Sequence, residues 1–235
     1  MRTLLAAVSL AIAACAGEAD ADLGRMTPIE KLLMEDSIYR ARTGDSTNRH
    51  VAFDYENLNR VVWQKPELLL DRLGPLEGKT VVEVGSGTGF FTRRLAKRRA
   101  RVIALDVDPS MLVLLDSLNA AQLDTAAYAR VDPRLVPPDD PRLGEAEGGA
   151  ALVVNTFMYI AERPEYLQRL ALGLEAGSPV LVVDFKKKAT PVGPPVDARL
   201  DMREVEVAME AAGYTAVSTD DTTLDYQYIV SGLAP

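Results

Sequence analysis

The order of apolar and polar positions divides most of the chain into alternating strands and helices. Four short, mainly β-branched runs predict buried strands: KTVVEV (79–84), RVIALD (101–106), LVVNTF (152–157) and PVLVVDF (179–185). Between them, segments near 90–99, 109–119 and 164–172 repeat their apolar positions with helical spacing. Because such alternation is typical of βαβ units, we expect a parallel sheet covered on both faces.

Further elements are predicted on both sides of this core. Before it, Thr27-Pro28 starts a helix that runs to about residue 42, a second helical stretch covers 53–62, and Pro66 opens a helix over 67–73. After it, 202–212 is helical and stops at Gly213, and 215–219 and 226–231 are two more strands. The pattern therefore predicts an α/β domain preceded by helices.

Length and composition agree with one such domain. The chain has 235 residues, of which 48% are hydrophobic, enough for a sizeable core. With 26 Lys and Arg against 34 Asp and Glu, the net charge of -8 works against binding nucleic acid, so we expect no such partner. One Cys and one His exclude a disulfide scaffold and are too few for a structural zinc site, so no metal is expected.

The N-terminus has the pattern of a targeting segment. Residues 1–16, MRTLLAAVSLAIAACA, place one Arg before an apolar run that is too short to span a bilayer. The run ends Ile12-Ala13-Ala14-Cys15, which resembles a bacterial lipobox. We expect a signal peptide over 1–15, acylation at Cys15, a tether over 16–24, and an exported lipoprotein anchored to a membrane. A cytoplasmic protein with a hydrophobic first helix is the alternative.

The strongest chemical signal is a glycine loop directly after the first predicted strand. It reads Glu83-Val84-Gly85-Ser86-Gly87-Thr88-Gly89-Phe90. It is neither the dinucleotide fingerprint GxGxxG, since Phe90 stands in the last glycine's place, nor a P-loop, since GK[ST] is absent. The next strand ends at Asp106, a carboxylate suited to a ribose diol. Acidic residues favour a cationic sulfonium ligand over a pyrophosphate.

This arrangement resembles motif I and the following acidic residue of class I S-adenosylmethionine-dependent methyltransferases. The resemblance runs from about residue 63 to the C-terminus and is nearest to ubiquinone/menaquinone C-methyltransferase-like enzymes and their exported bacterial relatives. WQKP (63–66), PPDDPRL (137–143) and PVGPP (191–195) resemble the family's cofactor-side and substrate-side loops. The resemblance implies that residues 74–235 form a doubly wound, Rossmann-like α/β fold of seven strands, the last of them antiparallel. It also implies a helical lid over residues 25–73.

The same resemblance implies a set of site residues for the cofactor S-adenosylmethionine. The loop around the methionine part would be formed by Glu83, Gly85, Ser86, Gly87 and Gly89, and Asp106 would hold the ribose. The adenine would lie beside Val107 and Met111, with its amino group near Asp139 or Asp140.

No catalytic residue is assigned from the sequence. After the fourth strand, the near relatives carry a histidine pair where this chain has Met158 and Tyr159, so a histidine base is excluded there. Asn155, Tyr159 and Asp184 are weak candidates. The lone histidine, His50, is expected to be a surface residue of the lid.

Three functional hypotheses compete. The first is methyl transfer from S-adenosylmethionine to a small or lipid-like acceptor. The second is an exported protein that binds S-adenosylmethionine or adenosine without catalysis. The third, a nicotinamide-dependent oxidoreductase, has the wrong glycine spacing.

Overall fold

The computed structural model describes residues 59–235, and these lie within one compact unit, Tyr55–Pro235. Several predictions fall on residues 1–58 and lie outside the described residues: the signal peptide with Cys15, the tether, the first predicted helix, His50 and most of the lid.

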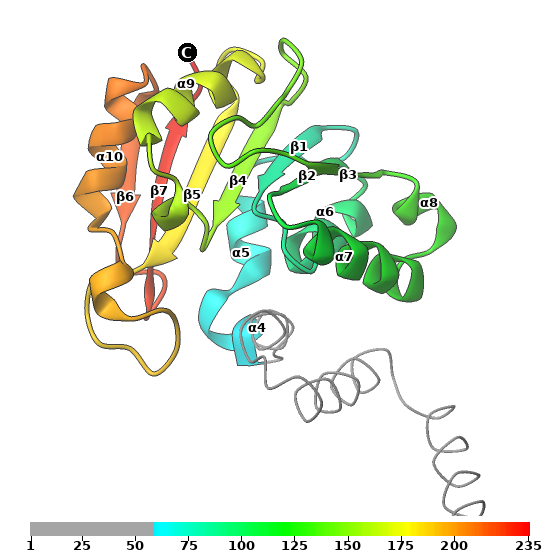
Figure 1. Ribbon diagram of the computed structural model, residues 1–235, viewed down its shortest axis with the longest axis horizontal. Helices are drawn as coiled ribbons and strands as arrows, with labels where there is room; N and C mark the ends of the chain where they lie inside the picture. Colours follow the sequence, from blue (N-terminus) through cyan, green and yellow to red (C-terminus); the bar gives the residue numbers. More distant parts are fainter. Residues whose placement is uncertain (1–58) are drawn as a thin grey trace, which may run out of the picture. The chain divides into compact units, whose positions relative to one another are not determined.

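A seven-stranded sheet in the order β3-β2-β1-β4-β5-β7-β6 forms the centre of the described part (Figure 1). All neighbouring strands pair in parallel except β7, which is antiparallel to both β5 and β6. The strands are β1 (Thr80–Val84), β2 (Arg101–Asp106), β3 (Val131–Leu135), β4 (Ala150–Val154), β5 (Pro179–Phe185), β6 (Thr215–Asp220) and β7 (Gln227–Leu233). The predicted doubly wound α/β fold of mostly parallel strands is confirmed.

Helices cover both faces of this sheet because alternate strand residues point to opposite sides. In β1, Val81 packs in one apolar cluster with residues of α5 and α6, whereas Val82 packs in the other with residues of α9 and α10. The helices are α4 (Asn59–Gln64), α5 (Pro66–Asp71), α6 (Phe90–Lys97), α7 (Pro109–Gln122), α8 (Thr125–Tyr128), α9 (Arg163–Leu172) and α10 (Met202–Ala211), with short 3₁₀ turns η1 (Phe157–Tyr159) and η2 (Val196–Ala198).

The fourth predicted strand is shifted, and this shift matters for the site. The sequence run suggested 152–157, but β4 is Ala150–Val154. Asn155 leaves the strand with a φ of +57°, and Phe157 begins the turn η1. Asparagine tolerates the left-handed region better than most residues, which lets the chain turn away at this point.

The basic residues of α6 are not all solvated. Arg93 is only 3% exposed and donates to the carbonyl of Thr88 at 2.6 Å. Arg98 forms ion pairs at 2.6 Å with both Glu67 and Asp71 of α5. These arginines therefore link the glycine loop and α5 to α6 within the protein.

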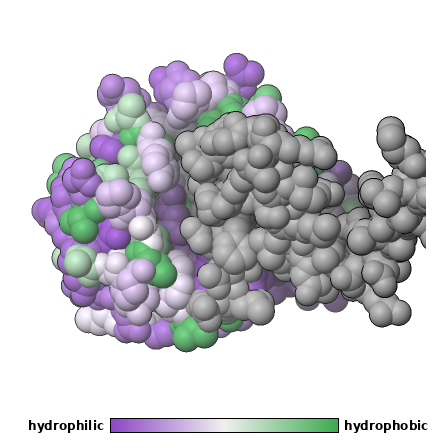
Figure 2. All heavy atoms as spheres, turned by 60° about the horizontal axis from the view of Figure 1, so that its bottom comes forward, coloured by the Kyte–Doolittle hydropathy of each residue, from purple (hydrophilic) through white to green (hydrophobic). Residues whose placement is uncertain are grey.

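On the face drawn in Figure 2, hydrophilic and hydrophobic residues of the described part are interspersed, and the visible part of that face has no large hydrophobic patch. Across residues 59–235, every helix is too short or too polar to cross a bilayer. The same residues contain no group of His, Cys, Asp and Glu that could hold a metal ion.

Candidate functional site

The glycine loop connects β1 to α6 at the carboxyl edge of the sheet. Gly85, Gly87 and Gly89 have φ values of +73°, +52° and +85°, a region that side chains disfavour. The amides of Gly85 and Ser86 both donate to the carbonyl of Leu105 at 2.9 Å. The loop is therefore fastened to the end of β2 before α6 begins at Phe90.

Gly85 is required by packing as well as by its backbone angle. A Cβ atom on Gly85 would lie 2.1 Å from Oγ1 of Thr156, the second residue after β4. Since β4 pairs with β1, the segment after β4 rests directly against the start of the glycine loop. The sequence reading assigned this glycine to ligand approach and did not single out Thr156.

Asp106 ends β2 and faces the same loop. Its Oδ2 accepts a hydrogen bond from Gly87 N at 2.7 Å, and its Oδ1 accepts one from Asp108 N at 2.9 Å. Burial raises the pKa of this carboxyl, while these backbone donors oppose the rise. Asp106 thus fixes the loop in addition to the ribose contact that the resemblance implies.

Glu83 supplies a second carboxyl below the loop. It is 5% exposed, and its Oε2 accepts a hydrogen bond from Thr92 Oγ1 at 2.5 Å. Burial raises its pKa to about 8, although the Thr92 bond and the cations of Arg60 and Arg93 oppose this rise. A cation bound beside Glu83 would lower the pKa of this carboxyl, because the positive charge favours its ionised form.

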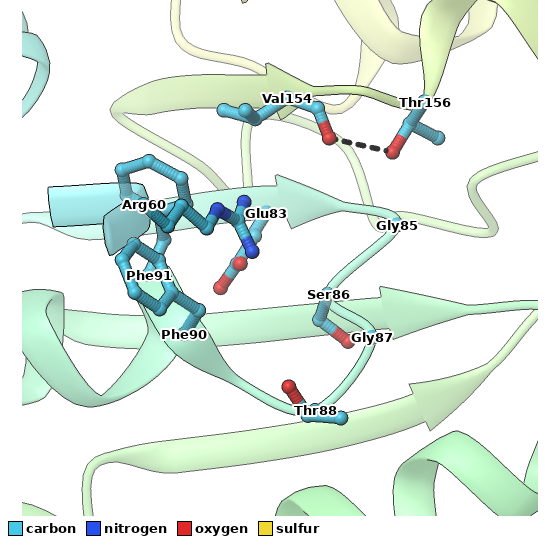
Figure 3. A pocket seen from close by; sticks show the side chains of 10 residues that line it. All are labelled: Arg60, Glu83, Gly85, Ser86, Gly87, Thr88, Phe90, Phe91, Val154 and Thr156. Carbon is cyan, nitrogen blue, oxygen red and sulfur yellow. Dashed lines mark hydrogen bonds between the residues drawn. The ribbon is translucent and has the colours of Figure 1, made fainter. Parts of the chain in front are cut away.

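These groups surround one pocket, shown in Figure 3. The side chain of Arg60, from α4, points toward Glu83, and its guanidinium lies 4.1 Å from the ring centroid of Phe90. The pocket is lined by Arg60, Glu83, Gly85, Ser86, Gly87, Thr88, Phe90, Phe91, Val154 and Thr156. The sequence did not predict Arg60 as a site residue, because Glu83 and Phe90, which it meets at the pocket, lie far from it along the chain.

The expected adenine-side residues lie directly after β2, on α7 and in the loop after β3. Val107 is exposed and Met111 is buried at the start of α7. Asp139 is exposed, and the Oδ1 of Asp140 accepts a local hydrogen bond from Arg142 N at 2.8 Å. The structure does not link Asp140 to the glycine loop by a hydrogen bond, so its adenine contact stays a prediction.

The three weak catalytic candidates occupy different environments. Asn155 is partly exposed beside Thr156, and Tyr159 is 68% exposed on η1. Asp184 is fully buried in β5. Lys186, the residue after β5, donates to the carbonyl of Leu224 at 2.8 Å. Asn155 is the candidate that the structure places nearest to the loop, through its neighbour Thr156.

The donor set fits S-adenosylmethionine. Ser86 Oγ is buried and has no hydrogen-bond partner among the described residues, so a ligand atom could satisfy it. Asp106 gives the site a carboxylate, and a sulfonium or ammonium ligand would favour the ionised form of Glu83 as well. Arg60 adds a cation that suits the carboxylate of the methionine part.

Replacing Asp106 with alanine should weaken cofactor binding by about 1–3 kcal/mol, because the loop loses its fastening and the ribose its acceptor. Calorimetry with S-adenosylhomocysteine measures this effect. Asp124→Ala is the matched control, since Asp124 caps α8 through Ala127 N and leaves the loop intact. If Asp106→Ala and the control bound equally well, Asp106 would have no place in the site.

Comparisons with known proteins agree with this geometry. Residues 81–177 match the family described as "Methyltransferase domain". The chain is 36% identical over 80 residues to "Probable ribosomal RNA small subunit methyltransferase A" of Methanosarcina mazei, covering 34% of this chain and 27% of that protein. It is 30% identical over 102 residues to "Phosphoethanolamine N-methyltransferase 1" of Arabidopsis thaliana, covering 43% of this chain and 19% of that protein. The chain therefore spans less than a third of these relatives.

A solved structure extends the likeness to most of the described part. The SAM-dependent methyltransferase of Aquifex aeolicus aligns with a TM-score of 0.70 at 22% identity, covering 77% of this chain and 96% of that one. At this identity the alignment establishes the fold, and the family match adds the domain type. Residues 81–177 therefore match a methyltransferase domain, and they lie within a described part that has the class I methyltransferase fold.

Proposed function

We propose that the protein transfers a methyl group from S-adenosylmethionine to a small or lipid-like acceptor. The observation that carries this proposal is a hydrogen bond between the loop after β1 and the last residue of β2. At the carboxyl edge of the sheet, the Gly87 amide is held 2.7 Å from the Asp106 carboxylate. This places bare backbone and a carboxylate where doubly wound sheets bind their ligands.

Several residues at and beside the pocket would have a part in this reaction. Bound S-adenosylmethionine would supply an electrophilic methyl group. Asp106 would accept the ribose hydroxyls, and Ser86 Oγ would meet a polar atom of the methionine part. Phe90 and Phe91 limit water on the side below Arg60 (Figure 3). Since direct displacement depends mainly on alignment, the protein can act through orientation and exclusion of water.

The acceptor class rests on charge and on resemblance. Two of the relatives are named for ribosomal RNA and for phosphoethanolamine. The net charge of -8 disfavours RNA as the acceptor for this chain. The resemblance to quinone C-methyltransferase-like enzymes supports a small or lipid-like acceptor instead.

Binding and turnover test the proposal in two steps. Calorimetry should show binding of S-adenosylmethionine and S-adenosylhomocysteine and none of NAD. Binding of NAD alone would contradict it. Formation of S-adenosylhomocysteine with members of an acceptor panel would then establish catalysis. Tight binding without product from any acceptor would favour the non-catalytic binding protein.

We also propose that the protein is exported and anchored through Cys15. The support is the sequence of residues 1–15, in which the single cysteine of the chain follows Ile12-Ala13-Ala14. A single acyl chain binds membranes only weakly, so stable anchoring needs more than one. Cys15→Ser should move the protein from the membrane fraction to the soluble fraction, with Ser9→Ala as a control that keeps the lipobox. A variant that stayed with the membrane would contradict acylation at Cys15.

A further inference from the structure

Four polar side chains form a continuous hydrogen-bonded chain beside the pocket. Arg60 Nε donates to Gln64 Oε1, and Gln64 Nε2 donates to Gln227 Oε1 at 2.9 Å. Gln227 Nε2 then donates to Asn155 Oδ1 at 2.5 Å. This relay joins α4, the first residue of β7 and the residue after β4, which lie far apart in the sequence.

Three of the four side chains in this relay are buried, and these three set which way each amide group points. Gln64 and Gln227 are both 0% exposed, and Arg60 is 5% exposed. Neither glutamine has an unpaired buried atom. A buried amide that lost its partner would cost free energy, so each amide is held in one orientation.

The arginine sets that orientation for every member. A guanidinium has donors and no acceptor, so Gln64 must turn its oxygen toward Arg60. Its nitrogen then faces Gln227, whose oxygen accepts and whose nitrogen faces Asn155. The oxygen of Asn155 is thereby engaged, and its Nδ2 has no acceptor among the described residues.

Asn155 stands between Val154 and Thr156, which both line the pocket, although Asn155 itself is not part of the lining. Its backbone N is tied to the carbonyl of Val183 in β5 at 2.9 Å. Its neighbour Thr156 packs against Gly85 and lines the pocket. The residue is partly exposed, and its Nδ2 is not bonded to any described residue.

We propose that Asn155 is a specificity-determining residue that donates from Nδ2 to a lone pair on a ligand oxygen, and that Arg60, Gln64 and Gln227 are positioning residues that fix this polarity. The inference rests on the proposed function. The oxygen belongs either to the acceptor, as a carbonyl or hydroxyl, or to the carboxylate of the cofactor. A protonated amino group is disfavoured opposite Nδ2, because it has no lone pair to accept the hydrogen bond.

Asn155→Asp tests the polarity with almost no change in shape, since it replaces the donor Nδ2 with an acceptor oxygen. The probes are acetophenone, which accepts hydrogen bonds and cannot donate them, and aniline, which is a better donor than acceptor. Their binding is measured by ligand-observed NMR on protein saturated with S-adenosylhomocysteine. The affinity of S-adenosylhomocysteine is measured separately by calorimetry.

The wild type should bind acetophenone about fivefold to tenfold more tightly than aniline, and Asn155→Asp should reverse this order. Gln227→Leu, which frees Asn155 to rotate, should bring the ratio toward one while S-adenosylhomocysteine still binds. If Asn155→Asp instead lowered the affinity of S-adenosylhomocysteine about tenfold with the probe ratio unchanged, the recognised oxygen would be the cofactor's.

The inference would be overturned if Asn155→Asp changed neither the probe ratio nor the affinity for S-adenosylhomocysteine. Failure of the wild type to bind S-adenosylhomocysteine at all is a separate result, which would contradict the proposed function. The two failures are therefore distinguishable in the same set of titrations.

Discussion

Replacing Gly85 with alanine should lower the free energy of unfolding by about 2–5 kcal/mol and abolish measurable binding of S-adenosylhomocysteine. Two costs combine at this residue. The φ of +73° is unfavourable for any side chain, and the new Cβ would lie 2.1 Å from Thr156 Oγ1. Relief of that clash would move the loop or the segment after β4, and both line the pocket. Denaturant unfolding and calorimetry measure the two effects.

Gly78→Ala is the matched control for this variant. Gly78 has nearly the same φ, +74°, but nothing lies within 4 Å of the position of its added Cβ. The control should therefore lose only the backbone contribution, about 1–2 kcal/mol, and should bind S-adenosylhomocysteine normally. Equal losses of stability in the two variants would show that the contact between Gly85 and Thr156 does not constrain the loop.

The free energy of unfolding should fall as the pH rises from about 4 to about 8, because two buried carboxyls resist ionisation in the folded state. Burial raises the pKa of Asp184 to about 8 against the partial opposition of Arg163, and it raises the pKa of Glu83 to about 8 as well. Ordinary values are 3.8 for Asp184 and 4.5 for Glu83. Between these limits the unfolded chain releases protons that the folded protein keeps. Each group then lowers stability by up to about 1.4 kcal/mol per pH unit.

Asp184→Asn isolates one of these contributions. The amide is nearly the same size and does not ionise, so the variant should lose stability less steeply above pH 4 and should exceed the wild type in stability near pH 8. Urea unfolding at a series of pH values measures the slopes. Asp197→Asn, at an exposed position in η2, is the control and should follow the wild type. A variant slope equal to that of the wild type would mean that Asp184 is ionised in the folded protein.

Much of the fold could be predicted because its signals are local. Buried strands β1, β2 and β5 are continuous apolar runs, and the predicted bounds agree with the observed ones to within one residue. β3 was not identified from its own residues, VDPRL, because it is a polar edge strand with a proline. The end of β4 was misplaced because the left-handed turn at Asn155 has no apolar signature.

The residues of the candidate site also fall into those that the sequence predicted and those that only the structure revealed. The glycine loop and Asp106 were predicted because each follows directly after a strand, and parallel strands end at one edge of the sheet. The sequence by itself determined the fold class, the position of this loop and its acidic partner, since these depend on spacing along the chain. Only the tertiary structure decided that Thr156 packs on Gly85, that Arg60 lies over Glu83, and that Gln64 and Gln227 orient Asn155. Those contacts join α4, β7 and the segments at the ends of β1 and β4, and their geometry exists only once the sheet and its helices have packed together.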